Sequence, residues 1–201
     1  MDFTGALYVR SKSGEEKAYI CLFTCANTRA IHLEVVSDLS EESFLQAFRR
    51  FVSRRSLPEM MISDNASTYL SAASEIEQLV KSTTVQDTLR YRGTTWQFIP
   101  KRAPWYGGFW ERLIGLTKMT MKKVLGRTFV SLTSLQTIVT EIEAVLNDRP
   151  ITHMSSDISD PEPLTPAHLL YGRRIVPLPY PTTDGSEIDD QSNNSPFLNL
   201  N

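Results

Sequence analysis

The sequence has no apolar run of 18 residues, only two cysteines and almost no excess of charge of either sign. The absence of such a run predicts no membrane span, and no positively charged apolar leader indicates a secretory signal. Cys21 and Cys25 have no histidine at zinc-finger spacing, which argues against a zinc site. Two buried thiols in a reducing compartment are therefore expected.

What is present is the composition of a globular protein. With 201 residues, 41% hydrophobic and 22% charged, the chain can bury the core of one domain. We expect a core over residues 1–175 and a disordered acidic tail over 176–201, where Pro, Ser and Asp accumulate.

The net charge of −2 is unevenly distributed. The last 21 residues carry four acids and no base, and setting these aside leaves +2 on residues 1–180. Local basic clusters are what a phosphate backbone meets, although each cluster alone fits an ordinary solvated surface equally well. The clusters are Arg49, Arg50, Arg54 and Arg55; Arg90, Arg92, Lys101 and Arg102; and the bases of residues 111–127.

Residue patterns predict alternating strands and helices. Short runs rich in β-branched and aromatic residues predict strands, and apolar residues at helical spacing predict helices. Strands are expected over 2–9, 17–25, 29–36, 59–63 and 95–100. Helices are expected from Ser40 to about Arg55 and over 71–82, 111–127 and 133–147, with a further ordered segment over 164–173.

The helix expected over 111–127 has an unusual outer face. Glu111, Gly115, Lys118 and Lys122 follow one another at i, i+4, i+7 and i+11, so they share one side. Such a stripe is also common on ordinary helix surfaces. Two further carboxylates, Asp2 on the first strand and Asp64 at the end of the fourth, make a Mg²⁺ site the sharper hypothesis, because Mg²⁺ prefers hard oxygen ligands.

The order of elements predicts a mixed α/β layer fold. It resembles the ribonuclease H-like fold, with a mixed five-stranded sheet of three antiparallel strands and then two parallel ones, flanked by helices. The sequence also resembles the integrase catalytic core of Bel/Pao-type long-terminal-repeat retrotransposons. The resemblance covers roughly residues 2–173, in eight segments: Asp2-Phe-Thr-Gly, Arg29-Ala-Ile-His-Leu-Glu, Ala47-Phe-Arg-Arg-Phe, Ile62-Ser-Asp-Asn-Ala, Trp96-Gln-Phe-Ile-Pro, Ala103-Pro-Trp-Tyr-Gly-Gly-Phe-Trp-Glu-Arg-Leu, Asn147-Asp-Arg-Pro and Leu164-Thr-Pro-Ala-His.

The resemblance implies a catalytic and metal-binding triad of Asp2, Asp64 and Glu111, holding two Mg²⁺ or Mn²⁺ ions. It implies end processing and strand transfer of element DNA by phosphoryl transfer. The expected location is the nucleus, entered by way of cytoplasmic particles. Element ends and a target duplex would be the partners of a homo-oligomer. The nucleic-acid-binding residues so implied are Asn65, Arg112, Lys118 and Lys122.

Two departures from the family matter. Ala6 stands where the family usually has Pro, and the chain starts at the acid of its first strand, which predicts a loosened metal site. A catalytically dead nucleic-acid-binding remnant and a ribonuclease H-like nuclease therefore stay open as alternatives. His32 and His168 are expected to be structural, and core packing is the expected role of Trp105, Tyr106 and Trp110.

Overall fold

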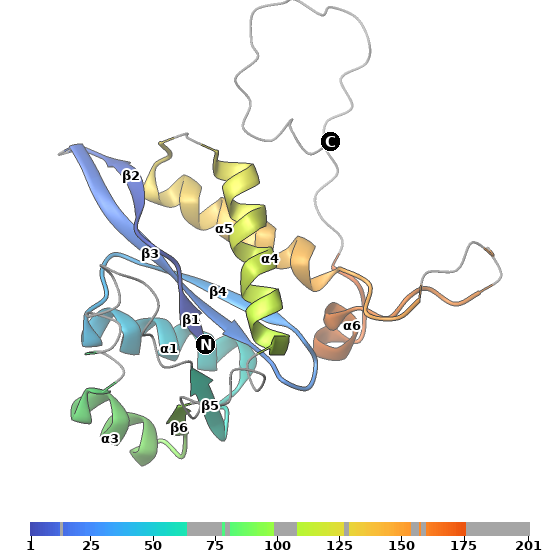
Figure 1. The fold of residues 1–201 in the computed structure, drawn as a ribbon, viewed down its shortest axis with the longest axis horizontal. Helices are drawn as coiled ribbons and strands as arrows, with labels where there is room; N and C mark the ends of the chain where they lie inside the picture. The colour runs from blue at the N-terminus through green and yellow to red at the C-terminus, as the bar shows by residue number, and fades with distance from the viewer. Residues whose placement is uncertain are drawn as a thin grey trace, which may run out of the picture.

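The computed structural model describes residues 1–12, 14–63, 78, 81–98, 108–126, 129–153, 157 and 160–175 (Figure 1). The tail expected over 176–201 and nearly all of the helix expected over 71–82 lie outside these residues. The elements are β1 Asp2–Phe3, β2 Leu7–Ser11, β3 Gly14–Thr24, β4 Ile31–Val36, α1 Glu41–Arg55, β5 Met60–Ser63, α3 Thr83–Tyr91, β6 Thr95–Phe98, α4 Gly108–Leu125, α5 Leu132–Asn147 and α6 Pro166–Tyr171.

The mixed α/β class is confirmed, and the strands divide between two sheets. β3 is the centre of an antiparallel sheet and pairs with β1, β2 and β4. β5 and β6 form a separate parallel pair. The two sheets meet at the start of the chain, where the ammonium group of Met1 donates to the carbonyl of Ile62 at 2.5 Å. This bond places the beginning of β1 beside the end of β5.

The strand expected over 2–9 is interrupted by Thr4–Ala6, so that β1 and β2 pair with β3 separately. Asp2 lies opposite Leu22 and Leu7 lies opposite Ala18. The first strand therefore uses one residue more than β3 between these points, which is the geometry of a β-bulge. A bulge bends its strand and locally re-aims the side chains near it.

Two apolar cores lie on opposite faces of the antiparallel sheet, because successive strand side chains point to opposite faces. Helices α4 and α5 cover one face, and α1 covers the other together with α3 and the parallel pair (Figure 1). Central residues of the first core are Ile20, Leu22, Ile114, Met121 and Leu135. Those of the second are Phe3, Cys21, Phe44, Phe48 and Trp96.

The helix boundaries follow local capping chemistry. Ser40 precedes α1 as predicted, and its hydroxyl accepts from the Ser43 N–H at 3.2 Å. α4 ends before Gly126, whose φ of 55° is a left-handed conformation that glycine adopts without strain. Among the helices of the described residues, none is long and apolar enough to cross a membrane.

The expectation of two buried thiols is wrong for one cysteine. Cys21 is buried in β3, and burial raises the pKa of its thiol above the ordinary range. Cys25 is exposed, because β3 ends at Thr24 and Cys25 lies in the turn that follows. The alternation of a strand thus stops one residue before Cys25.

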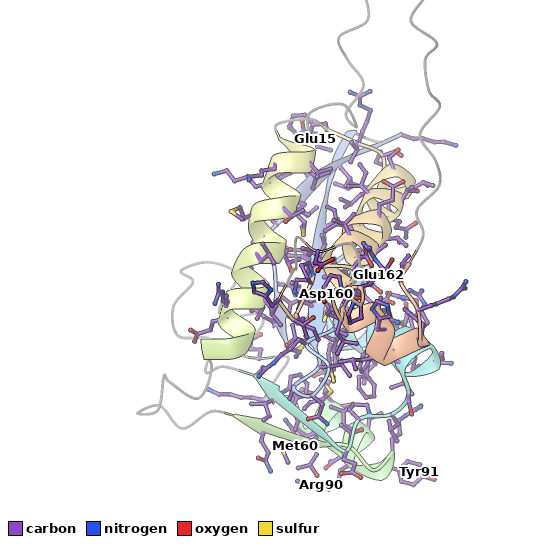
Figure 2. All side chains as sticks on the ribbon, turned by 90° about the vertical axis from the view of Figure 1, so that its right-hand side faces the viewer. Glu15, Met60, Arg90, Tyr91, Asp160 and Glu162 are labelled. Carbon is purple, nitrogen blue, oxygen red and sulfur yellow. The ribbon has the colours of Figure 1, made fainter. Side chains whose placement is uncertain are left out.

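Figure 2 shows the two ends of the molecule. Glu15, in the hairpin between β2 and β3, lies at one end, and Met60, Arg90 and Tyr91 lie at the other. The β5–β6 pair and α3 therefore extend the molecule away from the β2–β3 hairpin.

Candidate metal and nucleic-acid site

Asp2 lies on the sheet face that α4 covers. Its neighbour Phe3 is 3% exposed and packs beside Phe44 of α1, with 6.4 Å between ring centroids. Because alternate strand residues face opposite ways, the Asp2 side chain points toward α4 instead. The bulge that follows is held by Thr4, which donates its N–H to the Ile20 carbonyl and accepts the Ile20 N–H on its hydroxyl, both at 2.9 Å.

The carboxylate of Asp2 contacts a lysine of α4. The Lys118 ammonium donates to Asp2 Oδ2 at 2.9 Å, and the other carboxylate oxygen accepts the Phe3 N–H at 2.8 Å. The side chains of Asp2 and Lys118 are 22% and 33% exposed. The structure therefore brings together two residues that the sequence places 116 positions apart.

Three residues of the predicted stripe on helix α4 are exposed, and the fourth, Lys118, bonds Asp2. Ile114, Thr117 and Met121 are buried against the sheet, and the Thr117 hydroxyl donates to the Leu113 carbonyl. Exposed residues on the helix include Glu111 in its first turn, Arg112, Gly115 and Lys122. Glu111 and Lys118 are seven residues apart, so their Cα atoms are separated by about 10.5 Å along the helix axis.

Asp64 and Asn65 lie outside the described residues. β5 ends at Ser63, which is buried and accepts a hydrogen bond from the Trp96 indole at 3.0 Å. Met1 bonds the carbonyl of Ile62, so the end of β5 lies beside the start of β1, which carries Asp2. The described residues of this segment end at Ser63, one position before Asp64. Within the described ranges, no group of three metal-binding side chains occurs. Convergence of the predicted triad therefore stays a prediction.

A family model, the integrase core domain, matches residues 1–104, just over half of the chain. The chain belongs to the integrase core domain family. The matched range includes Asp2 and Asp64 and ends before α4, so Glu111 lies beyond it. Among curated proteins, no sequence matches this integrase core.

Solved structures share its fold. A chain of the simian T-cell lymphotropic virus intasome, solved in complex with PP2A regulatory subunit B56 gamma, is 11% identical with a TM-score of 0.57. That match covers 91% of the integrase core and 58% of the viral chain. The HTLV-2 integrase catalytic core domain, solved with magnesium in a trimeric form, is 15% identical with a TM-score of 0.52, covering 83% and 93%. The predicted ribonuclease H-like fold is confirmed.

One predicted basic cluster of the integrase core has another role. Glu34 is 4% exposed, and Arg50 Nε donates to its Oε2 at 2.6 Å while Arg54 lies 3.2 Å from its Oε1. Arg55 is ion-paired with Glu143 of α5. These arginines neutralise Glu34, which is buried, and Glu143, which is half-buried, so much of the positive charge on α1 serves the fold.

His32 is the centre of this charged cluster. It is 3% exposed, with Nε2 at 2.9 Å from Glu34 and Nδ1 at 3.2 Å from Glu143. His32 and His168 are the two histidines for which a structural role is expected, and His168 caps α6 together with Thr165. The two carboxylate partners of His32 were missed, since Glu143 is 111 positions away. One signal in the sequence could have indicated a polar contact here. Glu143 and Asn147 lie four residues apart on one helix, beside its buried apolar positions.

A cavity of about 380 Å³ includes Met1, the chain neighbour of Asp2, in its lining. It lies between the turn after β3, the end of α1, and β5, and its lining includes Phe23, Phe51, Arg55 and Met61. Neither Asp2, Glu111 nor Lys118 lines this cavity.

Proposed function

We propose that this integrase core is the catalytic part of an integrase from a Bel/Pao-type long-terminal-repeat retrotransposon. Its reaction is the trimming of element DNA ends and their transfer into a target duplex, both by phosphoryl transfer. The family match and the ordered series of motifs over residues 2–173 support this assignment. The observation that carries it is the position of Asp2 on the α4 face, paired with a lysine on the helix that bears Glu111.

The donor set fits a divalent cation. Asp2 offers a half-buried carboxylate that already attracts a positive group at 2.9 Å, and Glu111 offers an exposed one on the neighbouring helix. With Asp64, these residues would hold two Mg²⁺ or Mn²⁺ ions. Such ions activate the attacking oxygen and stabilise the leaving one in an in-line displacement. Asp2, Asp64 and Glu111 are needed as ligands, and no protein nucleophile is required.

The bases near Asp2 are proposed to hold DNA. Lys118, Lys122 and Arg112 lie on α4, where Lys122 and Arg112 are exposed. They supply positive charge for phosphate oxygens, which fixes the position of a duplex without reading its sequence. Asn65 is proposed to orient substrate beside Asp64.

The wider assignment includes the catalytic core over residues 1–175 and an acidic tail over 176–201. The chain spans 58% of the viral chain it matches, so the other activities of a whole integrase belong to the proposal. A homo-oligomer is proposed because two element ends must reach one target. The HTLV-2 core domain was solved in trimeric and dimeric forms. Nuclear localisation follows from the proposed reaction.

An end-joining assay tests the proposal. The purified chain is incubated with duplexes that carry element ends and with Mg²⁺ or Mn²⁺, and shortened and joined strands are measured. Asp64→Asn and Glu111→Gln should abolish both products while leaving the fold intact by circular dichroism. Glu141→Gln, which removes an exposed carboxylate of α5, should leave them unchanged. Unaltered turnover in the two site variants contradicts the assignment.

A non-catalytic DNA-binding remnant is the second candidate. It is favoured by the engagement of both Asp2 carboxylate oxygens, one by Phe3 and one by Lys118. A remnant binds DNA with strong salt dependence and yields no product with any metal, whether or not Asp64 is intact. A DNA/RNA hybrid offered in the same assay detects a ribonuclease H-like nuclease.

A further inference from the structure

The ion pair between Lys118 and Asp2 joins a predicted metal ligand to a predicted DNA-binding base. The ammonium group lies 2.9 Å from Asp2 Oδ2, while Asp2 Oδ1 accepts the Phe3 N–H. We propose that Lys118 is an internal counter-ion of Asp2 that a divalent cation displaces, which frees its ammonium group for a substrate phosphate. This inference rests on the proposed function, because it concerns the same carboxylate.

The two cations compete for one oxygen. A Mg²⁺ ion lies about 2.1 Å from a carboxylate ligand. An ammonium group bonded to the same carboxylate would then be only a few ångströms from the ion, and like charges at that distance repel strongly where water is partly excluded. Asp2 is 22% exposed, so the repulsion is only partly screened. A metal ligand role for Asp2 therefore requires Lys118 to move.

Lys118 has room to move. Its side chain is 33% exposed, and the neighbouring position of the stripe, Gly115, has no side chain. A lysine carries a compact charge on a flexible four-carbon stem, so it can exchange one anionic partner for another. Side chains of a helix tilt toward its N-terminus, which directs Lys118 along the stripe toward the turn of Glu111. The displaced ammonium thus stays on the face proposed to meet DNA.

Metal binding and phosphate binding are then coupled. The cation releases Lys118 for DNA, and DNA that holds Lys118 leaves Asp2 available for the cation. Coupling between two sites is reciprocal, so each ligand raises the affinity for the other by the same factor. A purely structural ion pair, which only fastens α4 to β1, has neither effect.

Mn²⁺ binding by the purified chain, followed by electron paramagnetic resonance, separates these cases. Lys118→Met keeps the apolar stem and removes the charge, and it should tighten Mn²⁺ binding by roughly two- to five-fold, the scale of a partly exposed ion pair. Lys17→Met, at an exposed base of β3, should leave Mn²⁺ affinity unchanged. Circular dichroism and thermal melting confirm that the variants are folded. Equal or weaker Mn²⁺ binding in Lys118→Met overturns the inference.

A second measurement follows the coupling itself. The affinity for a duplex should rise on addition of Ca²⁺ in the wild type and in Lys17→Met, and this rise should be largely lost in Lys118→Met. An equal Ca²⁺-dependent rise in all three proteins overturns the inference.

The outcomes distinguish this inference from the proposed function. If Asp2→Asn abolishes Mn²⁺ binding and Lys118→Met leaves it unchanged, Asp2 is a metal ligand and Lys118 is not its counter-ion. Mn²⁺ binding that is present in Lys118→Met and absent in the wild type supports the counter-ion role of Lys118. Absence of binding in both the wild type and Lys118→Met rejects the metal role of Asp2 and the counter-ion together.

Discussion

Asn147 of α5 bonds both backbone groups of Ile31 on β4. Its Oδ1 accepts the Ile31 N–H at 2.8 Å, and its Nδ2 donates to the Ile31 carbonyl at 2.8 Å. One helical turn earlier, Glu143 accepts the Leu33 N–H at 2.8 Å. In the part of the chain that the structure describes, β4 pairs with β3 alone, so these side chains replace a neighbouring strand at its free edge.

Replacement of Asn147 should destabilise the fold strongly. The residue is fully buried, and Asn147→Leu removes the partner of one backbone donor and one backbone acceptor without restoring water to either. Each unsatisfied buried group costs about 1–3 kcal/mol, so the free energy of unfolding should fall by about 2–6 kcal/mol. Urea denaturation measures this change. Gln136→Leu, at an exposed position of the same helix, should alter the free energy of unfolding by less than about 0.5 kcal/mol. Equal losses of stability in the two variants would contradict the role of Asn147 at the edge of β4.

The stability of the integrase core should fall as pH rises above the ordinary pKa of histidine. Burial disfavours the imidazolium of His32, but hydrogen bonds with Glu143 and Glu34 outweigh burial and raise the pKa of His32 above 6.5. A raised folded-state pKa contributes stability that is fully present below 6.5 and is lost as pH rises through the folded value. Three arginines of α1 also face this cluster: Arg50 and Arg54 pair with Glu34, and Arg55 pairs with Glu143.

Urea denaturation of the wild type and His32→Gln across this range isolates the contribution. The difference between their free energies of unfolding should be largest below about pH 6.5 and should narrow as pH rises. Burial raises the pKa values of Glu34 and Glu143, but their hydrogen bonds outweigh burial and lower both values. The stability that these two carboxylates contribute is therefore lost only below pH 4.5, outside the pH range in which His32 titrates. A difference that is constant with pH would show that His32 is not protonated in the fold.

Much of the fold is predictable from the sequence because its signals are local. Ser40 caps α1, Gly126 follows the end of α4, and apolar spacing marks both helices. The break at Thr4–Ala6 was not predictable, because it arises from the register of two strands against β3. Cys25 was misplaced for a related reason, since the end of β3 is set by its pairing with β4.

The candidate site is predictable only in part. Residue types and helical spacing place Glu111, Lys118 and Lys122 on one face of α4, and strand alternation places Asp2 on one face of the sheet. Which of the α4 residues meets Asp2 depends on how α4 crosses the sheet, and this is a tertiary property. The pairing of Asp2 with Lys118, and of Arg50 with Glu34, therefore required the structure.

Arg50 should matter for stability and not for DNA. Arg50→Ala leaves the buried Glu34 with one charged partner fewer, and because Arg50 is 39% exposed we expect a loss of about 1–2 kcal/mol in unfolding free energy. The salt dependence of DNA binding should be unchanged. Lys122→Ala should leave stability unchanged and reduce the slope of log affinity against log salt by about 1. A reduced slope in Arg50→Ala would place α1 on the DNA surface.

Gly115 should reveal whether DNA lies along the stripe of α4. It occupies an exposed interior position of the helix, and a Cβ built there meets no described atom within 4 Å. Since glycine costs a helix about 0.5–1 kcal/mol relative to alanine, Gly115→Ala should raise the free energy of unfolding by that amount. If a DNA backbone approaches the helix between Glu111 and Lys118, the added methyl group should weaken duplex binding although the protein is more stable. Urea denaturation and a duplex titration measure the two effects, with Met119→Ala as an exposed control; a gain in stability with unchanged DNA affinity would place the duplex elsewhere on α4.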